Sequence, residues 1–412
     1  MDHPGGRGGP ALATRSRRAI GVAGAAVAVA GAITSALGYL VPVLGARRLS
    51  AGDLGAIATV LAIAAITSVP GTGLQIAVAV HRARRPGATA GRAGWLTAAV
   101  CASAVALLAP VAGPLLDLPT TVTLLLAVYT GVIVLAGRWL GELQGDERFL
   151  RLALGMAVLA AGRYGGLIAG LLFGAGLTGS VLVGTAVAVL ILPALAVLAR
   201  RPTARPADSG ITARQVFTAC SAMLAMLAVS YADLILARDL LPADTSGAYA
   251  VGTVLTKGAL WAPQVVTVLA LPRLAQGSRR ALVMAHGLVA GSGAVLNLAS
   301  AVAGGVAFRL AGGPDYVGLG RYAPVFATVG ALYALVFVLV NARVAMGARW
   351  PSAPLWAAVV ALVVAAEWLV PHTFPAIMWC AAGTAALALA ATAFVTVRGG
   401  AGSPLPAGPA AS

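Results

Sequence analysis

The chain has 412 residues, of which 60% are hydrophobic and only 10% are charged. This composition, with a mean hydropathy of +0.93, excludes an ordinary soluble domain. The formal net charge of +16 would also fit a nucleic-acid-binding protein, but the arginines follow a topological pattern that argues against that class.

Apolar stretches of about 20 residues recur along the whole chain, and a helix of that length crosses the hydrocarbon core of a bilayer. The stretches are continuous rather than alternating, which is not the pattern of a membrane β-barrel. The sequence therefore predicts an all-α integral membrane protein with about twelve transmembrane helices, of which the eleventh is short and is followed by Pro371. The predicted spans are 19–44, 54–80, 95–116, 120–137, 152–174, 178–199, 215–237, 246–271, 281–308, 319–341, 354–370 and 374–397.

The basic residues lie mainly at alternate ends of the predicted spans. If the N-terminus is cytoplasmic, 21 of the 28 lysines and arginines fall on inner segments, five on outer segments and two inside spans. This imbalance is the one that the positive-inside rule requires. It predicts a multi-pass protein of the cytoplasmic membrane with both termini in the cytoplasm, in contact with anionic lipid headgroups and not with nucleic acid.

The longest polar break, residues 200–214, separates two halves of six predicted helices each. Because six is even, both halves enter the membrane from the same side, so an internal repeat would be parallel. The predicted organisation is a basic cytoplasmic N-terminal tail (1–18), an N-terminal lobe (19–199), a cytoplasmic linker (200–214), a C-terminal lobe (215–397) and a disordered C-terminal tail (398–412).

A stretch near the middle of the chain, residues 231–273, has an echo about 192 residues earlier. In this echo Pro70 matches Pro263. Each proline lies inside an apolar helix, where it removes a backbone hydrogen bond and favours a bend. Matched bends would suit helices that splay around a central cavity, although each can equally be a tolerated membrane proline.

Two cations lie deep inside the predicted spans. Arg163 is eleven residues past the inner end of the fifth span, and Lys257, the only lysine of the chain, is eleven residues past the outer end of the eighth. At ~1.5 Å per residue both are about 17 Å deep, near the midplane of a core roughly 30 Å thick. Two cations at this depth suggest an anionic ligand, unless each snorkels or pairs with a carbonyl or an acid.

Asp233 is the acid that could neutralise Lys257. It lies five residues before Arg238, nearer the outer boundary, and differs from Lys257 by about 9 Å in depth, so an ion pair is allowed but not required. A proton- or sodium-coupling role is the alternative. Neither charge is repeated in the echo, where Lys257 aligns with Ala64 or Ala65 and Asp233 with Val41 or Pro42.

The other polar residues inside spans have two interpretations. Gln75, Gln264, Asn297 and His286 either line a cavity or form helix–helix hydrogen bonds, and Glu367 is expected at the membrane interface. Glycines at 162, 166, 170 and 174 predict close packing of a neighbouring helix on the fifth span. Three cysteines in spans lack metal-ligand spacing and predict packing, with no metal site, catalytic residue or cofactor: Cys101, Cys220 and Cys380.

Three stretches resemble one family of transporters. LGARRLSAGDLGAIATVLAI (44–63) is similar to its opening helix pair. ARDLLPADTSGAYAVGTVLTKGALWAPQVVTVLALPRLA (237–275) and FRLAGGPDYVGLGRYAPVFATVGALYALVFVLVNARVAMG (308–347) are similar to its second half. The family is the bacterial oligosaccharide flippases, the polysaccharide-biosynthesis branch of the multidrug/oligosaccharidyl-lipid/polysaccharide (MOP) exporter superfamily. The similarity covers nearly all of the chain after residue 19.

The resemblance implies a MATE-like fold, with two six-helix lobes around a central cavity that works by alternating access. It implies a polyprenyl-pyrophosphate-linked glycan as the cargo, moved from the inner to the outer leaflet. It also implies that Arg163 and Lys257 meet the pyrophosphate or acidic sugars. Many relatives have fourteen spans, whereas about twelve are predicted here.

Two other classes of protein stay open. A drug or metabolite exporter of the same fold, coupled to protons or sodium, would need a buried acid, and the first six predicted spans contain no mid-membrane Asp or Glu. A membrane glycosyltransferase or glycan ligase would need clustered carboxylates or histidines at the membrane face, whereas Asp117, Asp315 and His372 stand on separate loops. We therefore expect a transporter and not an enzyme. The sequence does not indicate an oligomeric state.

Overall fold

The computed structural model describes residues 10–116, 118–200 and 210–400. Over these ranges it contains eleven helices that are long and apolar enough to cross a membrane, and one shorter apolar helix, Ala353–Leu369. The predicted all-α class with about twelve spans is therefore confirmed. Residues 1–9, 117, 201–209 and 401–412 lie outside the described residues, and with them lie much of the predicted N-terminal tail, the linker and the C-terminal tail.

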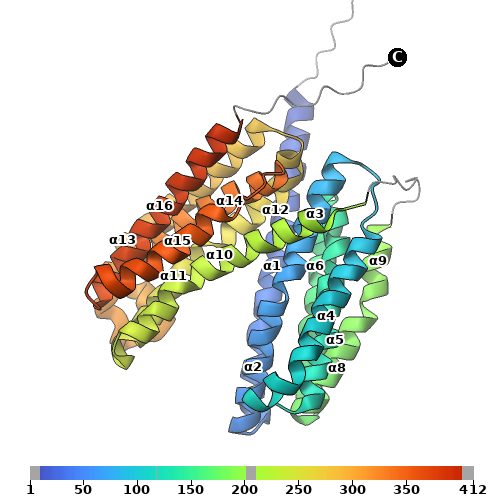
Figure 1. Cartoon of the computed structure of the whole chain (residues 1–412), viewed down its shortest axis with the longest axis horizontal. Coiled ribbons are helices and arrows are strands. Elements are labelled where there is room, and N and C mark those ends of the chain that lie inside the picture. Colours follow the sequence, from blue (N-terminus) through green and yellow to red (C-terminus); the bar gives the residue numbers. More distant parts are fainter. Residues whose placement is uncertain (1–9, 117, 201–209, 401–412) are drawn as a thin grey trace, which may run out of the picture. The chain divides into compact units, whose positions relative to one another are not determined.

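Two compact units make up the chain, unit 1 (Met1–Val216) and unit 2 (Phe217–Ser412). Figure 1 colours unit 1 from blue to green and unit 2 from yellow-green to red. The elements of unit 1 are α1 (Pro10–Arg48), α2 (Ala51–Thr67), α3 (Val69–Arg84), α4 (Gly91–Leu115), α5 (Thr120–Gly145), α6 (Phe149–Ala160), the π-helical turn η1 (Ala161–Gly165), α7 (Gly166–Leu172), α8 (Gly176–Leu190) and α9 (Leu192–Ala199).

Helix α5 is the centre of unit 1. It contacts α2, α3, α4, α6, α8 and α9, and nearly all of its residues from 129 to 145 are buried. Glycines allow α3 to approach its backbone, because a Cβ on Gly141 would stand 2.5 Å from the carbonyl oxygen of Gln75. A Cβ on Gly145 would stand 2.7 Å from the carbonyl oxygen of Ala79.

The glycine spacing of the fifth span predicted close packing, and this is confirmed for three of the four glycines. A Cβ on Gly166 would stand 2.7 Å from the Cα of Gly184, and one on Gly170 would stand 2.5 Å from the Cα of Ser180, both on α8. Gly162 also packs closely, but against the side chain of Ile191, which directly follows α8. Gly174 has a different role: its φ of +70° lies in the left-handed region, which terminates α7.

The predicted end of the fourth span at residue 137 was wrong, because α5 continues to Gly145. Arg138, Glu142 and Gln144 follow residue 137, and hydropathy alone predicts a loop there. They are satisfied instead inside the helical bundle. The Arg138 Nε donates to Glu142 Oε1 at 3.1 Å, and the Gln75 amide on α3 donates to Gln144 Oε1 at 2.9 Å.

Unit 2 is organised around α14, which contacts α11, α12, α13 and α16 and is mostly buried. Its aromatic core joins Tyr249, Phe326 and Phe374, with the Tyr249 and Phe326 rings edge to face at 5.2 Å. The elements are α10 (Ala213–Leu240), α11 (Ala243–Ala259), α12 (Trp261–Ala275), α13 (Arg279–Gly312), the 3₁₀ segment η2 (Pro314–Tyr322), α14 (Ala323–Ala345), α15 (Ala353–Val364), the π-helical turn η3 (Ala365–Leu369) and α16 (Phe374–Gly400).

The local structure of the two units repeats. The helix of the second span is interrupted at Ser68 (φ −79°, ψ −15°), and that of the eighth at Leu260 (φ −81°, ψ −12°), 192 positions later. The two interruptions directly precede the segments that carry Pro70 and Pro263, where bends were predicted. The fifth and eleventh spans each contain a π-helical turn, with Arg163 third in η1 and Glu367 third in η3.

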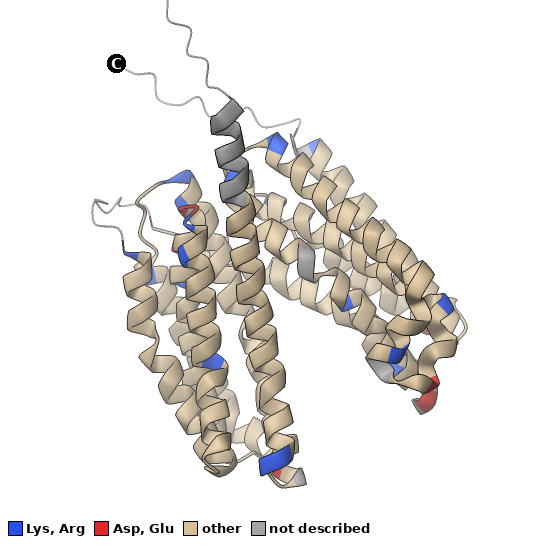
Figure 2. Ribbon diagram, turned by 180° about the vertical axis from the view of Figure 1, so that it is seen from behind, with Lys and Arg blue, Asp and Glu red and all other residues tan. Residues whose placement is uncertain are grey.

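Charged residues lie mainly near the ends of the helices of each unit, and the middle turns carry few of them (Figure 2). This is the expected distribution for helices whose middle parts lie in hydrocarbon. The exceptions are Arg163 in unit 1 and Asp233 and Lys257 in unit 2, and they are the candidates for contact with a ligand.

Candidate functional site

Arg163 lines two adjoining cavities in unit 1, of about 160 Å³ and 380 Å³. Thr34 of α1 also lines both. The smaller cavity is walled by residues of α1, α3, α5 and α6, and Gln75 is among them. The larger one is walled by α1, α2 and α5, with three tyrosines around Arg163: Tyr39, Tyr129 and Tyr164. Of the predicted site residues, the structure thus brings Arg163 and Gln75 together.

The Arg163 side chain is cationic and incompletely satisfied. Its Nε is buried and has no hydrogen-bond partner among the described residues, and none of the carboxylates described pairs with it. Its guanidinium carbon lies 5.3 Å from the ring centroid of Tyr164, which is a weak cation–π contact. No Asp or Glu is among the residues that line either cavity. An intramembrane cation without a counter-charge is costly, so these cavities suit an anion.

Tyr129 holds the backbone that carries Arg163. A π-helical turn widens the helix and breaks its regular hydrogen-bond pattern. The buried hydroxyl of Tyr129 on α5 donates to the Arg163 carbonyl oxygen at 2.8 Å. Sequence reasoning missed both the π-helical turn and Tyr129. The flanking glycines were the only local signal, and they were interpreted as packing positions.

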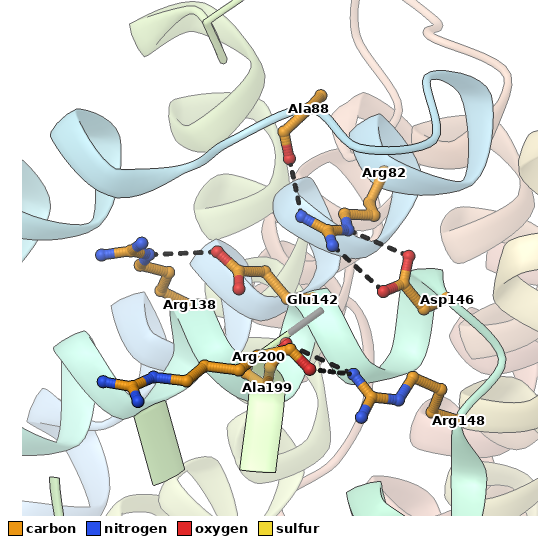
Figure 3. A network of polar contacts seen from close by, with 8 residues as sticks. All are labelled: Arg82, Ala88, Arg138, Glu142, Asp146, Arg148, Ala199 and Arg200. Atoms are coloured by element: carbon orange, nitrogen blue, oxygen red, sulfur yellow. Dashed lines mark hydrogen bonds and ion pairs between the residues drawn. The ribbon is translucent and has the colours of Figure 1, made fainter. Parts of the chain in front are cut away.

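Gln75 also connects the cavity to a polar network at the arginine-rich end of unit 1, which we define by residues 81–92 and 138–151. Its amide donates to Gln144 there. Arg82 binds both carboxylate oxygens of Asp146, at 2.9 and 3.1 Å, and its Nη1 donates to the Ala88 carbonyl at 2.8 Å. Figure 3 shows the guanidinium of Arg82 between these two partners.

The same network holds the end of α9. The Nη1 of Arg148 donates to the carbonyl oxygens of Ala199 and Arg200 at 3.3 and 3.2 Å (Figure 3). Arg148, which directly precedes α6, thereby satisfies carbonyls at the C-terminus of a helix, where a cation is favoured. These contacts join three segments of unit 1: the end of α3 at Arg82, the end of α5 at Asp146 and the end of α9 at Ala199.

The three predicted cavity residues of unit 2 have different surroundings. The Asn297 amide on α13 donates to the Pro324 carbonyl at 3.1 Å and contacts the Thr328 hydroxyl, so it joins α13 to α14. Gln264 is exposed on α12. His286 is half-buried, and its Nδ1 lies 2.9 Å from the Leu282 carbonyl of its own helix. The helix–helix interpretation therefore fits Asn297 best.

Asp233 and Lys257 lie in unit 2 without forming an ion pair. Asp233 is 2% exposed and accepts hydrogen bonds from the Leu234 backbone N–H at 2.8 Å and from the Tyr249 hydroxyl at 3.2 Å. The Nζ of Lys257 lies over the ring of Tyr231, 3.7 Å from its centroid. A cation–π contact thus takes the place of the pair that the sequence allowed.

Other groups offer little chemistry. Among the described residues no cluster of three or more His, Cys, Asp or Glu could hold a metal ion. The three cysteines form no disulfide bond and are half-buried. Glu367 is half-buried in η3, and its carbonyl lies 3.4 Å from His372 Nε2.

Comparisons with known proteins bear on the fold. No protein-family model and no curated protein matches the sequence. Solved structures do match. A mutant of the Vibrio cholerae MATE transporter VcmN has a TM-score of 0.74 at 15% identity, over 93% of this chain and 97% of that one. The eukaryotic MATE transporter AtDTX14 has a TM-score of 0.70 at 13% identity, over 95% and 96%.

A multidrug resistance MATE family transporter of the MOP superfamily, in an outward-facing conformation, has a TM-score of 0.68 at 13% identity, over 92% of this chain and 97% of that one. The chain has the MATE transporter fold. This confirms the predicted MATE-like architecture along nearly its whole length. At these identities the likeness concerns the fold alone.

Proposed function

We propose that the chain is a membrane transporter that exports an anionic, lipid-linked glycan of the polyprenyl-pyrophosphate type by alternating access. The observation that carries the proposal is the chemistry of the unit 1 cavities, where Arg163 has a buried, unpartnered Nε and no acid in the surrounding walls. A pyrophosphate offers the charge and the acceptor oxygens that a guanidinium binds in two-pronged geometry.

The same chemistry disfavours a cationic cargo in unit 1. A cationic drug would be repelled by Arg163 and would find no carboxylate in the cavity walls. Polar groups beside Arg163, among them Thr34 and Gln75, suit hydroxyl-rich sugars. The arginine-rich end of unit 1 is proposed to face the cytoplasm, in keeping with the positive-inside rule, so export would run away from that side.

The second candidate is a proton- or sodium-coupled exporter of a drug or metabolite. It is favoured by one observation, the burial of Asp233 in the interior of unit 2. An ionisable acid inside a span commonly marks an ion pathway. If the chain is such an exporter, an imposed ion gradient should drive uptake of a cationic dye into vesicles. Asp233→Asn should then abolish this uptake.

Binding of a defined lipid tests the proposal. The purified chain is titrated with a short-chain polyprenyl pyrophosphate that carries an oligosaccharide, and with the matching polyprenol. We expect selective binding of the pyrophosphate lipid and a loss of about 10- to 100-fold in affinity for Arg163→Gln, because a hydrogen bond to a charged group contributes about 1.5–3 kcal/mol.

The matched control is Arg279→Gln, at an exposed arginine that begins α13. It should leave the affinity within about twofold, since exposed charges contribute little. Equal binding of polyprenol and pyrophosphate lipid, or equal losses in the two variants, would contradict the proposed cargo. Flipping of the same lipid in proteoliposomes then tests transport itself.

A further inference from the structure

The two cavities of unit 1 share Arg163 and Thr34, but their other polar walls differ. The remaining polar side chains of the smaller cavity are Ser68, Thr72 and Gln75. Apart from Tyr129, those of the larger cavity are Ser35, Tyr39 and Tyr164. The hydrogen bonds that these groups already form decide which of them can still donate to a ligand.

In the smaller cavity most of the oxygens can only accept. The Thr34 hydroxyl donates to the carbonyl four residues earlier at 2.8 Å, and the Ser68 hydroxyl donates to the carbonyl three residues earlier at 2.7 Å. A hydroxyl has one hydrogen and two lone pairs, so both oxygens offer a ligand lone pairs alone. Gln75 uses one amide hydrogen on Gln144, and its Oε1 is a third acceptor. Thr72 keeps its hydroxyl hydrogen, so acceptors dominate this wall without filling it.

In the larger cavity the hydroxyl hydrogens are available. Ser35, Tyr39 and Tyr164 form no side-chain hydrogen bond with the described residues, and Tyr39 is 75% exposed. The Tyr164 hydroxyl lies beside α1, because a Cβ on Gly38 would stand 3.5 Å from its oxygen. This wall therefore brings three O–H donors to the guanidinium of Arg163.

The two walls thus suit different parts of one molecule. Ionised phosphate oxygens accept hydrogen bonds, so they match the donors of the larger cavity and are disfavoured by lone pairs in the smaller one. Sugar hydroxyls and amide N–H groups can donate to those lone pairs. A cavity of about 150 Å³ takes benzene, so the smaller cavity, at about 160 Å³, has about the size of one six-membered ring.

We propose that Arg163 joins two subsites, a phosphate subsite in the larger cavity and a sugar subsite in the smaller one. The pyrophosphate accepts hydrogen bonds from Arg163, Tyr39 and Tyr164. The sugar next to it donates its hydroxyls to Thr34 and Ser68. This inference rests on the proposed function, and it adds the orientation of the cargo and a requirement for a first sugar that donates hydrogen bonds.

Three lipids test the sugar subsite on the purified wild-type chain. They are a short-chain polyprenyl pyrophosphate without sugar, the same lipid with one hexose, and the same lipid with a deoxyfluoro hexose, in which fluorine replaces the hydroxyls and removes their hydrogens. The hexose should raise the affinity about 10- to 30-fold, the gain expected for two neutral hydrogen bonds. The deoxyfluoro hexose should bind like the sugar-free lipid.

Two double variants that remove hydroxyls separate the subsites. Tyr39→Phe with Tyr164→Phe should weaken binding of the sugar-free lipid about tenfold or more, because hydrogen bonds to a charged acceptor are lost. Thr34→Val with Ser68→Ala should leave that affinity within about twofold and remove most of the gain from the hexose. Melting temperatures show whether each variant is folded.

The possible failures are distinguishable. Equal losses for both double variants on both lipids, or a deoxyfluoro hexose that binds as tightly as the hexose, would overturn the two subsites and leave the proposed function standing. A pyrophosphate lipid that binds no more tightly than polyprenol would refute the proposed function, and the subsites with it. The comparison of lipids on the wild type decides the matter even if a variant does not fold.

Discussion

The Arg82–Asp146 pair offers a sharp test of how unit 1 is held together. Its side chains are only 7% and 3% exposed, and its shortest contact is 2.9 Å. Asp146→Asn keeps the shape of the side chain but removes its charge and one of its two acceptor oxygens, so the buried guanidinium of Arg82 loses its counter-charge. Breaking a buried pair in this way costs about 3–5 kcal/mol. For a unit of ~200 residues this corresponds to a fall of roughly 6–20 °C in melting temperature.

Glu142→Gln is the matched control, four residues earlier in the same network (Figure 3). Its partner Arg138 is one turn away on the same helix, and the two side chains are 20% and 10% exposed. Such a pair contributes about 0.5–1 kcal/mol, so the melting temperature should fall by only a few degrees. Both variants are measured as purified protein in one detergent, by intrinsic fluorescence on heating.

A third variant separates a lost interaction from a stranded charge. Replacing Arg82 and Asp146 together by leucine removes both charges, and exchange of a buried ion pair for apolar side chains is often nearly neutral. The double variant should therefore melt above Asp146→Asn. If Asp146→Asn melts no lower than Glu142→Gln, the assignment of a buried, stabilising pair to this end of unit 1 is wrong.

Three further predictions concern the cavity, the packing and the topology. Tyr129→Phe removes a buried donor from the Arg163 carbonyl, which should cost about 1–3 kcal/mol and weaken binding of the pyrophosphate lipid by about tenfold; unchanged affinity would mean that Tyr129 does not position Arg163. Gly141→Ala should destabilise unit 1 by about 1–3 kcal/mol through overpacking against α3, whereas Gly55→Ala, whose Cβ would meet nothing within 4 Å, should be neutral or stabilising. In a background without native cysteines, Ser209→Cys should resist an impermeant reagent in intact cells and Thr245→Cys should react; the reverse pattern would invert the proposed orientation.

Most of the fold could be predicted from the sequence, because hydropathy and the helix-bending effect of proline depend only on short stretches of the chain. Continuous apolar runs located the spans within a few residues, and prolines at 70 and 263 marked the two interruptions that Ser68 and Leu260 form. The fourth span was predicted too short for a physical reason. Its last eight residues include Arg138, Glu142 and Gln144, and only contacts such as Gln75 to Gln144 make these side chains compatible with a buried helix.

The site was predictable only in part. A mid-span arginine is conspicuous in a sequence, so Arg163 was identified, but the cavity depends on a π-helical turn and on Tyr129, which is 34 residues away in the chain. No hydropathy pattern reports either feature. Asn297 is the opposite case. A polar residue in a span can form a hydrogen bond with a neighbouring helix as readily as with a ligand, and the sequence does not distinguish the two. The hydrogen bond from Asn297 to the Pro324 carbonyl shows that it contacts a neighbouring helix.

The repeated backbone and the unrepeated charges together suggest a division of labour. Both units contain the same interruption in their second span and the same π-helical turn in their fifth, yet the third residue of that turn is Arg163 in unit 1 and Glu367 in unit 2. The two units thus have a charged residue at the same position of the π-helical turn, and the sign of that charge differs between them. Unit 1 has an unneutralised cation, which requires an external anion. The buried acid of unit 2, Asp233, lies outside this turn and accepts hydrogen bonds from Leu234 and Tyr249. If the cargo's charge is recognised in unit 1, Arg163→Gln should lower the rate of lipid flipping in proteoliposomes.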